Sequence, residues 1–229
     1  SPIEPDCSGV LDDGQFIYDG HVTQPTIEGP KLYKRNGYYY IFAPAGGVKP
    51  GWQTVLRSKN IYGPWEEKIV LHQGNSPVNG PHQGAWVDTP DGQDWFLHFQ
   101  DVGNAGRIVH LQPMHWENDW PVIGVNEVDG CGEPVLRYKV GETYPIDAPE
   151  DSDFFEGENL GLQWQWNANY KKEWYDLENG QLILHAQAAD PKTQLCDISN
   201  LLLQKWPAPE FSITTCLHLE EMKDGDVAG

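Results

Sequence analysis

Short runs of apolar and aromatic residues alternate with turn-forming residues along the chain, a pattern typical of β-strands. One arrangement occurs twice, over residues 27–42 and 82–99: a polar residue and a glycine lead into a short strand, a hairpin turn and an aromatic strand. The two copies are 55 residues apart at each of three pairs: Gly29 with Gly84, Gly37 with Gly92, and Trp65 with Trp120. A fixed period of this size, built from strands and hairpins, predicts the blades of a β-propeller.

Each predicted blade has a hairpin, a third strand and an edge strand. The first covers residues 27–70, with its turn at Asn36-Gly37, and the second covers residues 82–123, with its turn at Asp91-Gly92. Two blades are too few to close a propeller, since four or more are usual. We therefore expect residues 1–143 to be part of a longer propeller domain.

The pattern changes after residue 143. Residues 144–150 carry two prolines and two acidic residues, which predicts a linker. In residues 151–229, short runs such as Leu162–Trp166 and Phe211–Leu217 alternate between apolar and polar positions, which predicts the N-terminal part of a β-sandwich. No segment has the period of an amphipathic helix, so the expected fold class is all-β.

The composition favours a neutral, ring-shaped ligand. Lys+Arg 15 against Asp+Glu 34 gives a net charge of −19, which argues against nucleic acid and anionic membranes, because both bind basic patches. Trp 10, Tyr 10 and Phe 7 supply flat apolar faces that can stack on sugar rings. The four cysteines form no CxxC pair, so a metal cluster is not expected, while two disulfides and four buried thiols both stay open.

Glu28 is the first candidate for a chemical role. It precedes Gly29-Pro30 at the start of an inner strand, and inner strands line the axis of a propeller. Apolar and aromatic neighbours disfavour the charged form and raise the pKa of a carboxyl group, which suits a general acid. The 55-residue offset places Gln83 at the equivalent position of the second blade. A glutamate that caps a turn or pairs with an arginine is the alternative.

His82 and Arg107 are the other two candidates. His82 opens the second blade, where it can orient a carboxylate, or hold a water or a metal, near the axis; from the residues alone a buried histidine bonded to backbone is the preferred alternative. Arg107 opens the third strand of that blade, where its guanidinium can bind substrate hydroxyls or a carboxylate. A surface ion pair with Asp101 is the alternative for Arg107, and it would contribute little.

At these residues the chain resembles glycoside hydrolase family 43. The order and spacing of four stretches carry the resemblance, over roughly residues 15–125: residues 27–40, 58–65, 82–92 and 106–114. The resemblance implies a five-bladed β-propeller with an axial active site that acts on arabinose- and xylose-containing plant polysaccharides. Residues 151–229 resemble the concanavalin A-like β-sandwich of β-xylosidase-like members, notably at Leu160–Asn167.

The resemblance also assigns roles. It implies an inverting reaction with a base, a pKa-tuning aspartate and a general acid, and Glu28 falls on the acid. His82 falls on an axial histidine that in some members approaches a bound calcium through water. Arg107 falls on an arginine that contacts substrate and tunes the acid. No residue here matches the base or the tuning aspartate, which we expect in earlier blades outside this chain.

The sequence thus predicts an inverting glycosidase that releases xylose or arabinose from xylan or arabinoxylan oligosaccharides, with the 229-residue chain inactive alone. We expect no cofactor apart from a calcium near His82 as an alternative, and no nucleic-acid or membrane partner. A plant-polysaccharide substrate favours a secreted or periplasmic location over the cytoplasm. A glycan-binding module without catalysis and a propeller scaffold for protein partners are the competing hypotheses.

Overall fold

The structure is a computed structural model that describes residues 1–141, 147, 150–188, 190, 192–219 and 222–224. The chain divides into two compact units, Ser1–Thr143 and Tyr144–Gly229. Strands are the main regular element of both units, although most of the second unit is irregular, and the helical elements of the described residues are three single 3₁₀ turns, which confirms the all-β class. Of the predicted linker, all positions except 147 and 150 lie outside the described residues.

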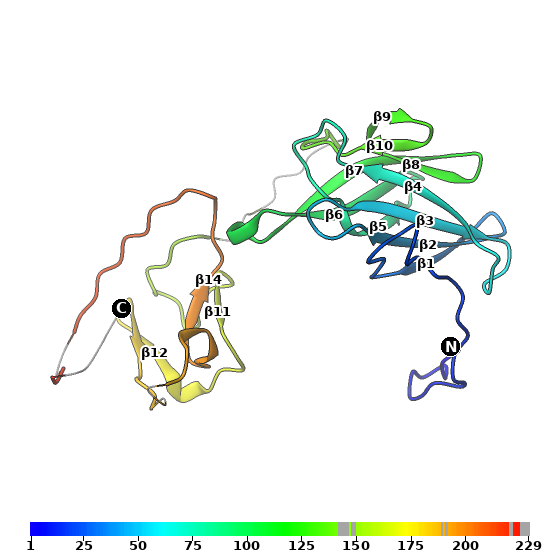
Figure 1. Cartoon of the computed structure of the whole chain (residues 1–229). Helices are drawn as coiled ribbons and strands as arrows, with labels where there is room; N and C mark the ends of the chain where they lie inside the picture. The colour runs from blue at the N-terminus through cyan, green and yellow to red at the C-terminus, as the bar shows by residue number, and fades with distance from the viewer. Residues whose placement is uncertain (142–146, 148–149, 189, 191, 220–221, 225–229) are drawn as a thin grey trace. The chain divides into compact units, whose positions relative to one another are not determined.

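The first unit contains two sheets (Figure 1). The first sheet has the strand order β1-β2-β3-β4-β10-β9 and comprises β1 (Lys31–Arg35), β2 (Tyr38–Ala45), β3 (Trp52–Ser58), β4 (Glu66–His72), β9 (Val125–Val128) and β10 (Cys131–Glu133). The second sheet has the order β5-β6-β7-β8 and comprises β5 (His82–Asp88), β6 (Asp94–Asp101), β7 (Arg107–Glu117) and β8 (Trp120–Ile123), with η1 (Gly103–Ala105) between β6 and β7.

The predicted repeat is present as two antiparallel four-stranded meanders, β1–β4 and β5–β8. The meanders differ in their first hairpin. Asn36 and Gly37, at φ 48° and 80°, form a two-residue turn between paired Arg35 and Tyr38, as the sequence predicts. In the second meander the Asp91-Gly92 turn lies inside a longer loop between Asp88 and Asp94. Two such sheets do not by themselves make a five-bladed propeller.

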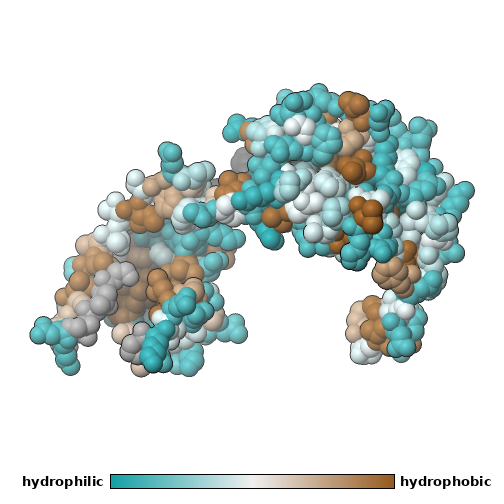
Figure 2. All heavy atoms as spheres, viewed as in Figure 1, coloured by the Kyte–Doolittle hydropathy of each residue, from teal (hydrophilic) through white to brown (hydrophobic). Residues whose placement is uncertain are grey.

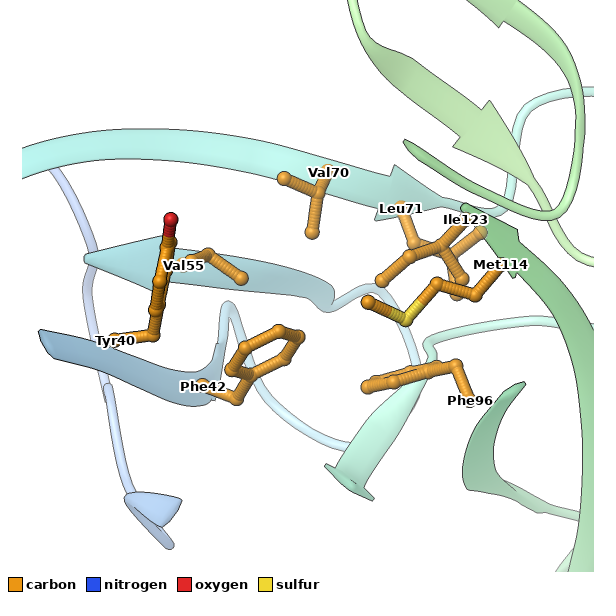
Figure 3. Close-up of a cluster of buried hydrophobic side chains, with 8 residues drawn as sticks. All are labelled: Tyr40, Phe42, Val55, Val70, Leu71, Phe96, Met114 and Ile123. Carbon is orange, nitrogen blue, oxygen red and sulfur yellow. The ribbon is translucent and has the colours of Figure 1, made fainter. Parts of the chain in front are cut away.

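A hydrophobic cluster packs the two sheets against each other (Figure 3). The first sheet contributes Tyr40, Phe42, Val55, Val70 and Leu71, and the second contributes Phe96, Met114 and Ile123. Burying each large apolar side chain contributes about 1.5–3 kcal/mol. This cluster therefore fixes the start of β5 relative to the residues that precede β1, which is where the candidate site lies.

Arg57 provides a polar tie between the sheets. Its guanidinium, on β3, donates to the carbonyl oxygens of Asn118 and Asp119 in the β7–β8 turn at 3.0 and 3.1 Å. It also lies over the rings of Trp120 and Tyr38 at 4.2 and 4.8 Å. The Arg57 side chain is mostly buried, so these contacts are shielded from water.

The second unit has two small sheets. Its elements are β11 (Trp164–Trp166) paired with β14 (Leu202–Gln204), β12 (Tyr175–Glu178) paired with β13 (Gln181–Leu184), and the turns η2 (Lys172–Trp174) and η3 (Leu195–Asp197). The strand expected at Leu162–Trp166 is present in its second half. The strand expected at Phe211–Leu217 is wrong: this segment pairs with no strand among the described residues, and Ile213 is 76% exposed. Alternation alone does not make a strand where no partner edge is available.

The four cysteines are free thiols in the structure, but the alternative of four buried thiols is wrong: Cys7, Cys196 and Cys216 are exposed and Cys131 is half-buried. The visible surface of the first unit is mainly hydrophilic (Figure 2), as expected for a chain with a net charge of −19. Within the described ranges, no helix is both long enough and apolar enough to cross a membrane.

Candidate functional site

Glu28 lies in the segment that leads into β1. Its amide N–H donates to the carbonyl oxygen of Pro44, at the end of β2, at 3.1 Å. Gly29 follows at φ 53°, a left-handed conformation that glycine adopts without steric cost, and turns the chain towards β1. The backbone of Glu28 is therefore fixed, while its side chain is 53% exposed and free to meet a ligand.

His82 meets Glu28 from the second sheet. His82 is fully buried at the start of β5, and its Nε2 lies 2.7 Å from Oε1 of Glu28. The ring packs against Phe99, with centroids 5.8 Å apart. Its Nδ1 is buried without a hydrogen-bond partner among the described residues. The side chain of His82 thus bonds to a carboxylate rather than to backbone.

Arg107 lies at the same end of the second sheet. Its guanidinium carbon is 4.6 Å from the centre of the Phe99 ring, the ring that also contacts His82. Within the described part of the chain, Arg107 forms no ion pair with Asp101, although the two are backbone partners across β6 and β7. The positive charge of Arg107 instead acts on Glu28, whose pKa it helps to lower.

The expected pKa shift of Glu28 is wrong in direction. The hydrogen bond from His82 is the largest cause that holds the pKa of Glu28 below its ordinary value; the charge of His82, a hydrogen bond from Gln83 and the charge of Arg107 act in the same direction. Partial burial raises the pKa but is outweighed, because the carboxyl group is half exposed. Sequence neighbours could not reveal donors that come from another sheet.

Gln83 also contacts Glu28, although the sequence pattern does not predict this contact. Its Nε2 lies 3.3 Å from Oε1 of Glu28. The 55-residue repeat made Gln83 the counterpart of Glu28, and that equivalence was the available signal. It did not indicate contact, because contact requires the two meanders to place these positions side by side.

A metal does not fit this site as the chain presents it. No group of three His, Cys, Asp or Glu residues among the described positions is placed to hold a metal ion. The unpartnered Nδ1 of His82 is a single nitrogen, whereas calcium prefers six to eight oxygen ligands.

Both parts of the chain match known protein families. The model of glycosyl hydrolases family 43 matches residues 2–121, more than half of the chain. The chain belongs to this family. A second model, the β-xylosidase C-terminal concanavalin A-like domain, matches residues 152–229 of this family 43 chain. The resemblance of both parts is thereby confirmed, and residues 152–229 match a concanavalin A-like domain.

Several family 43 relatives are considerably longer than this chain. "Putative beta-xylosidase" from Xylanibacter ruminicola is 50% identical over 221 residues, which cover 93% of this chain and 40% of that protein. "Beta-xylosidase" from Formosa agariphila is 38% identical over 209 residues, covering 81% of this chain and 35% of that protein. The crystal structure of a family 43 protein from Bacillus licheniformis matches with a TM-score of 0.75 at 26% identity, over 90% of this chain and 42% of that chain.

Proposed function

We propose that the full-length protein is an inverting glycosidase that releases xylose or arabinose from xylan or arabinoxylan oligosaccharides, with Glu28 as the general acid. The observation that carries the proposal is the half-exposed carboxyl group of Glu28 held at 2.7 Å by the buried ring of His82. Relatives named β-xylosidase and non-reducing end α-L-arabinofuranosidase support the substrate class.

The local geometry suits proton donation to a leaving oxygen. His82 and the backbone bond to Pro44 hold Glu28 in place, so its carboxyl group meets the glycosidic oxygen in a fixed orientation. When the proton leaves, the new carboxylate is stabilised by the hydrogen bond from His82 and by the charge of Arg107. We propose that Arg107 also binds substrate hydroxyls, and its exposure at the start of β7 supports this role.

Inversion needs a second carboxylate that activates water from the opposite face of the sugar, about 6.5–9.5 Å from the acid. None of the groups that dominate the pKa of Glu28 is a carboxylate. We propose that the base and the pKa-tuning aspartate belong to other blades of a five-bladed propeller, outside these 229 residues. A plant-polysaccharide substrate makes a secreted or periplasmic location part of the same proposal.

Hydrolysis of p-nitrophenyl β-D-xyloside, p-nitrophenyl α-L-arabinofuranoside, xylobiose and arabinobiose by the full-length protein tests this function. Glu28→Gln should lower kcat for the cleaved disaccharide by at least about a hundredfold, the scale of general acid catalysis. The loss should be smaller for the aryl glycoside, whose leaving group needs less protonation. Glu117→Gln, at an exposed glutamate of β7, is the matched control and should leave both rates unchanged.

Two results would contradict the proposal. Equal losses for aryl glycoside and disaccharide in Glu28→Gln would remove Glu28 from the role of acid. A protein that binds xylo- or arabino-oligosaccharides but cleaves none of the four substrates would be a glycan-binding module.

A further inference from the structure

The backbone at Gln83 is unusual for its residue type. Gln83 has φ 52°, in the left-handed region that few residues other than glycine occupy, and such a conformation costs about 1–3 kcal/mol. It lies where the pairing of β5 with β6 is irregular, between His82 and Ala85. Consecutive residues of a regular strand point to opposite faces, but a bulge changes this. Here it allows the side chains of both His82 and Gln83 to reach Glu28.

The carboxamide of Gln83 is held from a second direction. A side-chain carbon at Gly29 would overlap the Oε1 of Gln83, so the carboxamide lies directly against this glycine. Lys31 Nζ donates to the same Oε1 at 3.4 Å and to the carbonyl oxygen of Gly29 at 3.0 Å. Because an ammonium group can only donate, the Gln83 atom that faces Lys31 must be the amide oxygen Oε1. The amide nitrogen therefore faces Glu28.

Both contacts with the Glu28 carboxyl group are made at one oxygen. His82 Nε2 and Gln83 Nε2 lie 2.7 and 3.3 Å from Oε1. Within the described part of the chain, no hydrogen bond is made to Oε2. The hydrogen bond from His82 lowers the pKa of Glu28, which assigns the Nε2 proton to His82 and makes Oε1 an acceptor from both sides. With two N–H groups directed at Oε1, the acid proton is left to the other oxygen.

We propose that Gln83 is a positioning residue for the general acid, an inference that rests on the proposed function of Glu28: with His82, it holds Oε1 as a pure acceptor and assigns the transferable proton to Oε2. Lys31 fixes the orientation of the Gln83 amide. When the proton moves from Oε2 to the leaving oxygen, the two N–H donors at Oε1 stabilise the carboxylate that forms.

The pH dependence separates this role from a structural one. The charged or titratable groups around Glu28 are His82, Arg107 and, through Gln83, Lys31. Loss of the Gln83 donor removes a contact that favours the carboxylate, so the pKa of Glu28 should rise. Activity needs the protonated acid, and the basic limb of the kcat/KM profile should therefore move to higher pH.

The experiment compares the full-length wild type with Gln83→Met and Gln83→Gly. Glycine adopts φ 52° without strain, so Gln83→Gly removes the carboxamide and should retain the thermal stability of the wild type. For xylobiose or arabinobiose, whichever the wild type cleaves, kcat should fall about tenfold to a hundredfold, the range for a hydrogen bond to a charged group. KM should change little, the aryl glycoside should lose less, and the basic limb should move up.

Gln93→Met is the matched control, because Gln93 also donates to a carboxylate, that of Asp91, in the β5–β6 loop. It should leave rates and pH profile as in the wild type. Equal losses on both substrates in the Gln83 variants, with the basic limb unmoved, would overturn the positioning role while the proposed function stands. A wild type that hydrolyses none of these substrates would overturn both.

Discussion

At the scale of single residues, the chemistry rests on which groups meet Glu28. Its sequence neighbours Ile27, Gly29 and Pro30 suggest an apolar setting and a raised pKa. The structure shows donors from β5, more than fifty positions away, that lower the pKa instead. Residue types and the repeat were enough to select Glu28 and His82 as candidates. The direction of the pKa shift depends on their contact, which only the packing of two sheets creates.

His82→Phe, which keeps a buried ring but has no N–H group, tests the main donor to Glu28. The hydrogen bond from His82 is the largest cause of the lowered pKa of Glu28, so its removal should raise this pKa. The basic limb of kcat/KM in the full-length protein should then extend to higher pH, while kcat for the disaccharide falls about tenfold or more. His115→Gln, at an exposed histidine of β7, is the control. A basic limb that moves to lower pH would contradict a hydrogen bond from His82 that stabilises the Glu28 carboxylate.

At the scale of elements, the strands of the two meanders follow from their alternation and from the turns at Asn36-Gly37 and Asp91-Gly92. The repeat also predicts the order of the strands. It does not predict the irregular pairing at Gln83 or the longer β5–β6 loop, because both depend on how neighbouring strands align. At Phe211–Leu217 the alternation is present but the partner strand is not, within the residues described.

Arg57 should matter for the stability of the first unit. Arg57→Lys keeps the charge but loses the planar group that donates to Asn118 and Asp119 and lies over Trp120. We expect a loss of about 1–3 kcal/mol in the free energy of unfolding, measured by denaturant titration. Arg137→Lys, at an exposed arginine, should change it by less than about 0.5 kcal/mol. Equal losses of unfolding free energy in Arg57→Lys and Arg137→Lys would show that the contacts of Arg57 with the β7–β8 turn do not stabilise the first unit.

His98 makes the same unit sensitive to acid. Gln112 bonds to Val135 through its Oε1, so its Nε2 donates to Nε2 of His98, whose Nδ1 in turn donates to the Phe99 carbonyl oxygen. The His98 ring is therefore neutral, and a second proton, on its Nε2, would face the Gln112 N–H group with no acceptor nearby among the described residues. Burial lowers the pKa of His98 to about 4. The unfolded chain binds a proton near its ordinary value, so stability should fall as pH drops from about 6.5 to about 4.

Denaturant titrations across this pH range measure the effect. His98 lowers the free energy of unfolding by about 3 kcal/mol between the upper and lower ends of this pH range. His98→Gln should flatten the dependence of unfolding free energy on pH, whatever its effect at neutral pH. His115→Gln, which alters an exposed histidine, should keep the slope of the wild type. An unchanged slope in His98→Gln would show that other groups cause the acid sensitivity.

At the scale of the whole molecule, the chain spans about two-fifths of the relatives that it matches. It contains a candidate acid with its supports, and we propose that the groups that activate water lie in the remainder. The sequence suggests this division because the repeat contains two copies and only one of them carries a carboxyl group, that of Glu28, at the shared position. It could not predict the choice between xylose and arabinose, because binding pockets need all the surfaces that surround a sugar.

The purified 229-residue chain should therefore show no turnover of either aryl glycoside, because an acid without a base cannot complete inversion. The assay is release of p-nitrophenol at enzyme concentrations far above those used for the full-length protein. Circular dichroism must first show that the chain is folded. Turnover that disappears in Glu28→Gln would contradict the proposed division.

The contact between Glu28 and Gln83 joins two equivalent positions of the repeat. Two carboxyl groups at this distance would behave as a dyad: they would share one proton, and neither titration step would belong to one residue. An amide in the second copy breaks that symmetry. The Gln83 amide donates a hydrogen bond as a protonated carboxyl group would, but it never ionises. The pair therefore has one exchangeable proton, that of Glu28. The repeat thus builds a matched pair of positions, and one atom, nitrogen in place of oxygen, makes it a monoprotic acid.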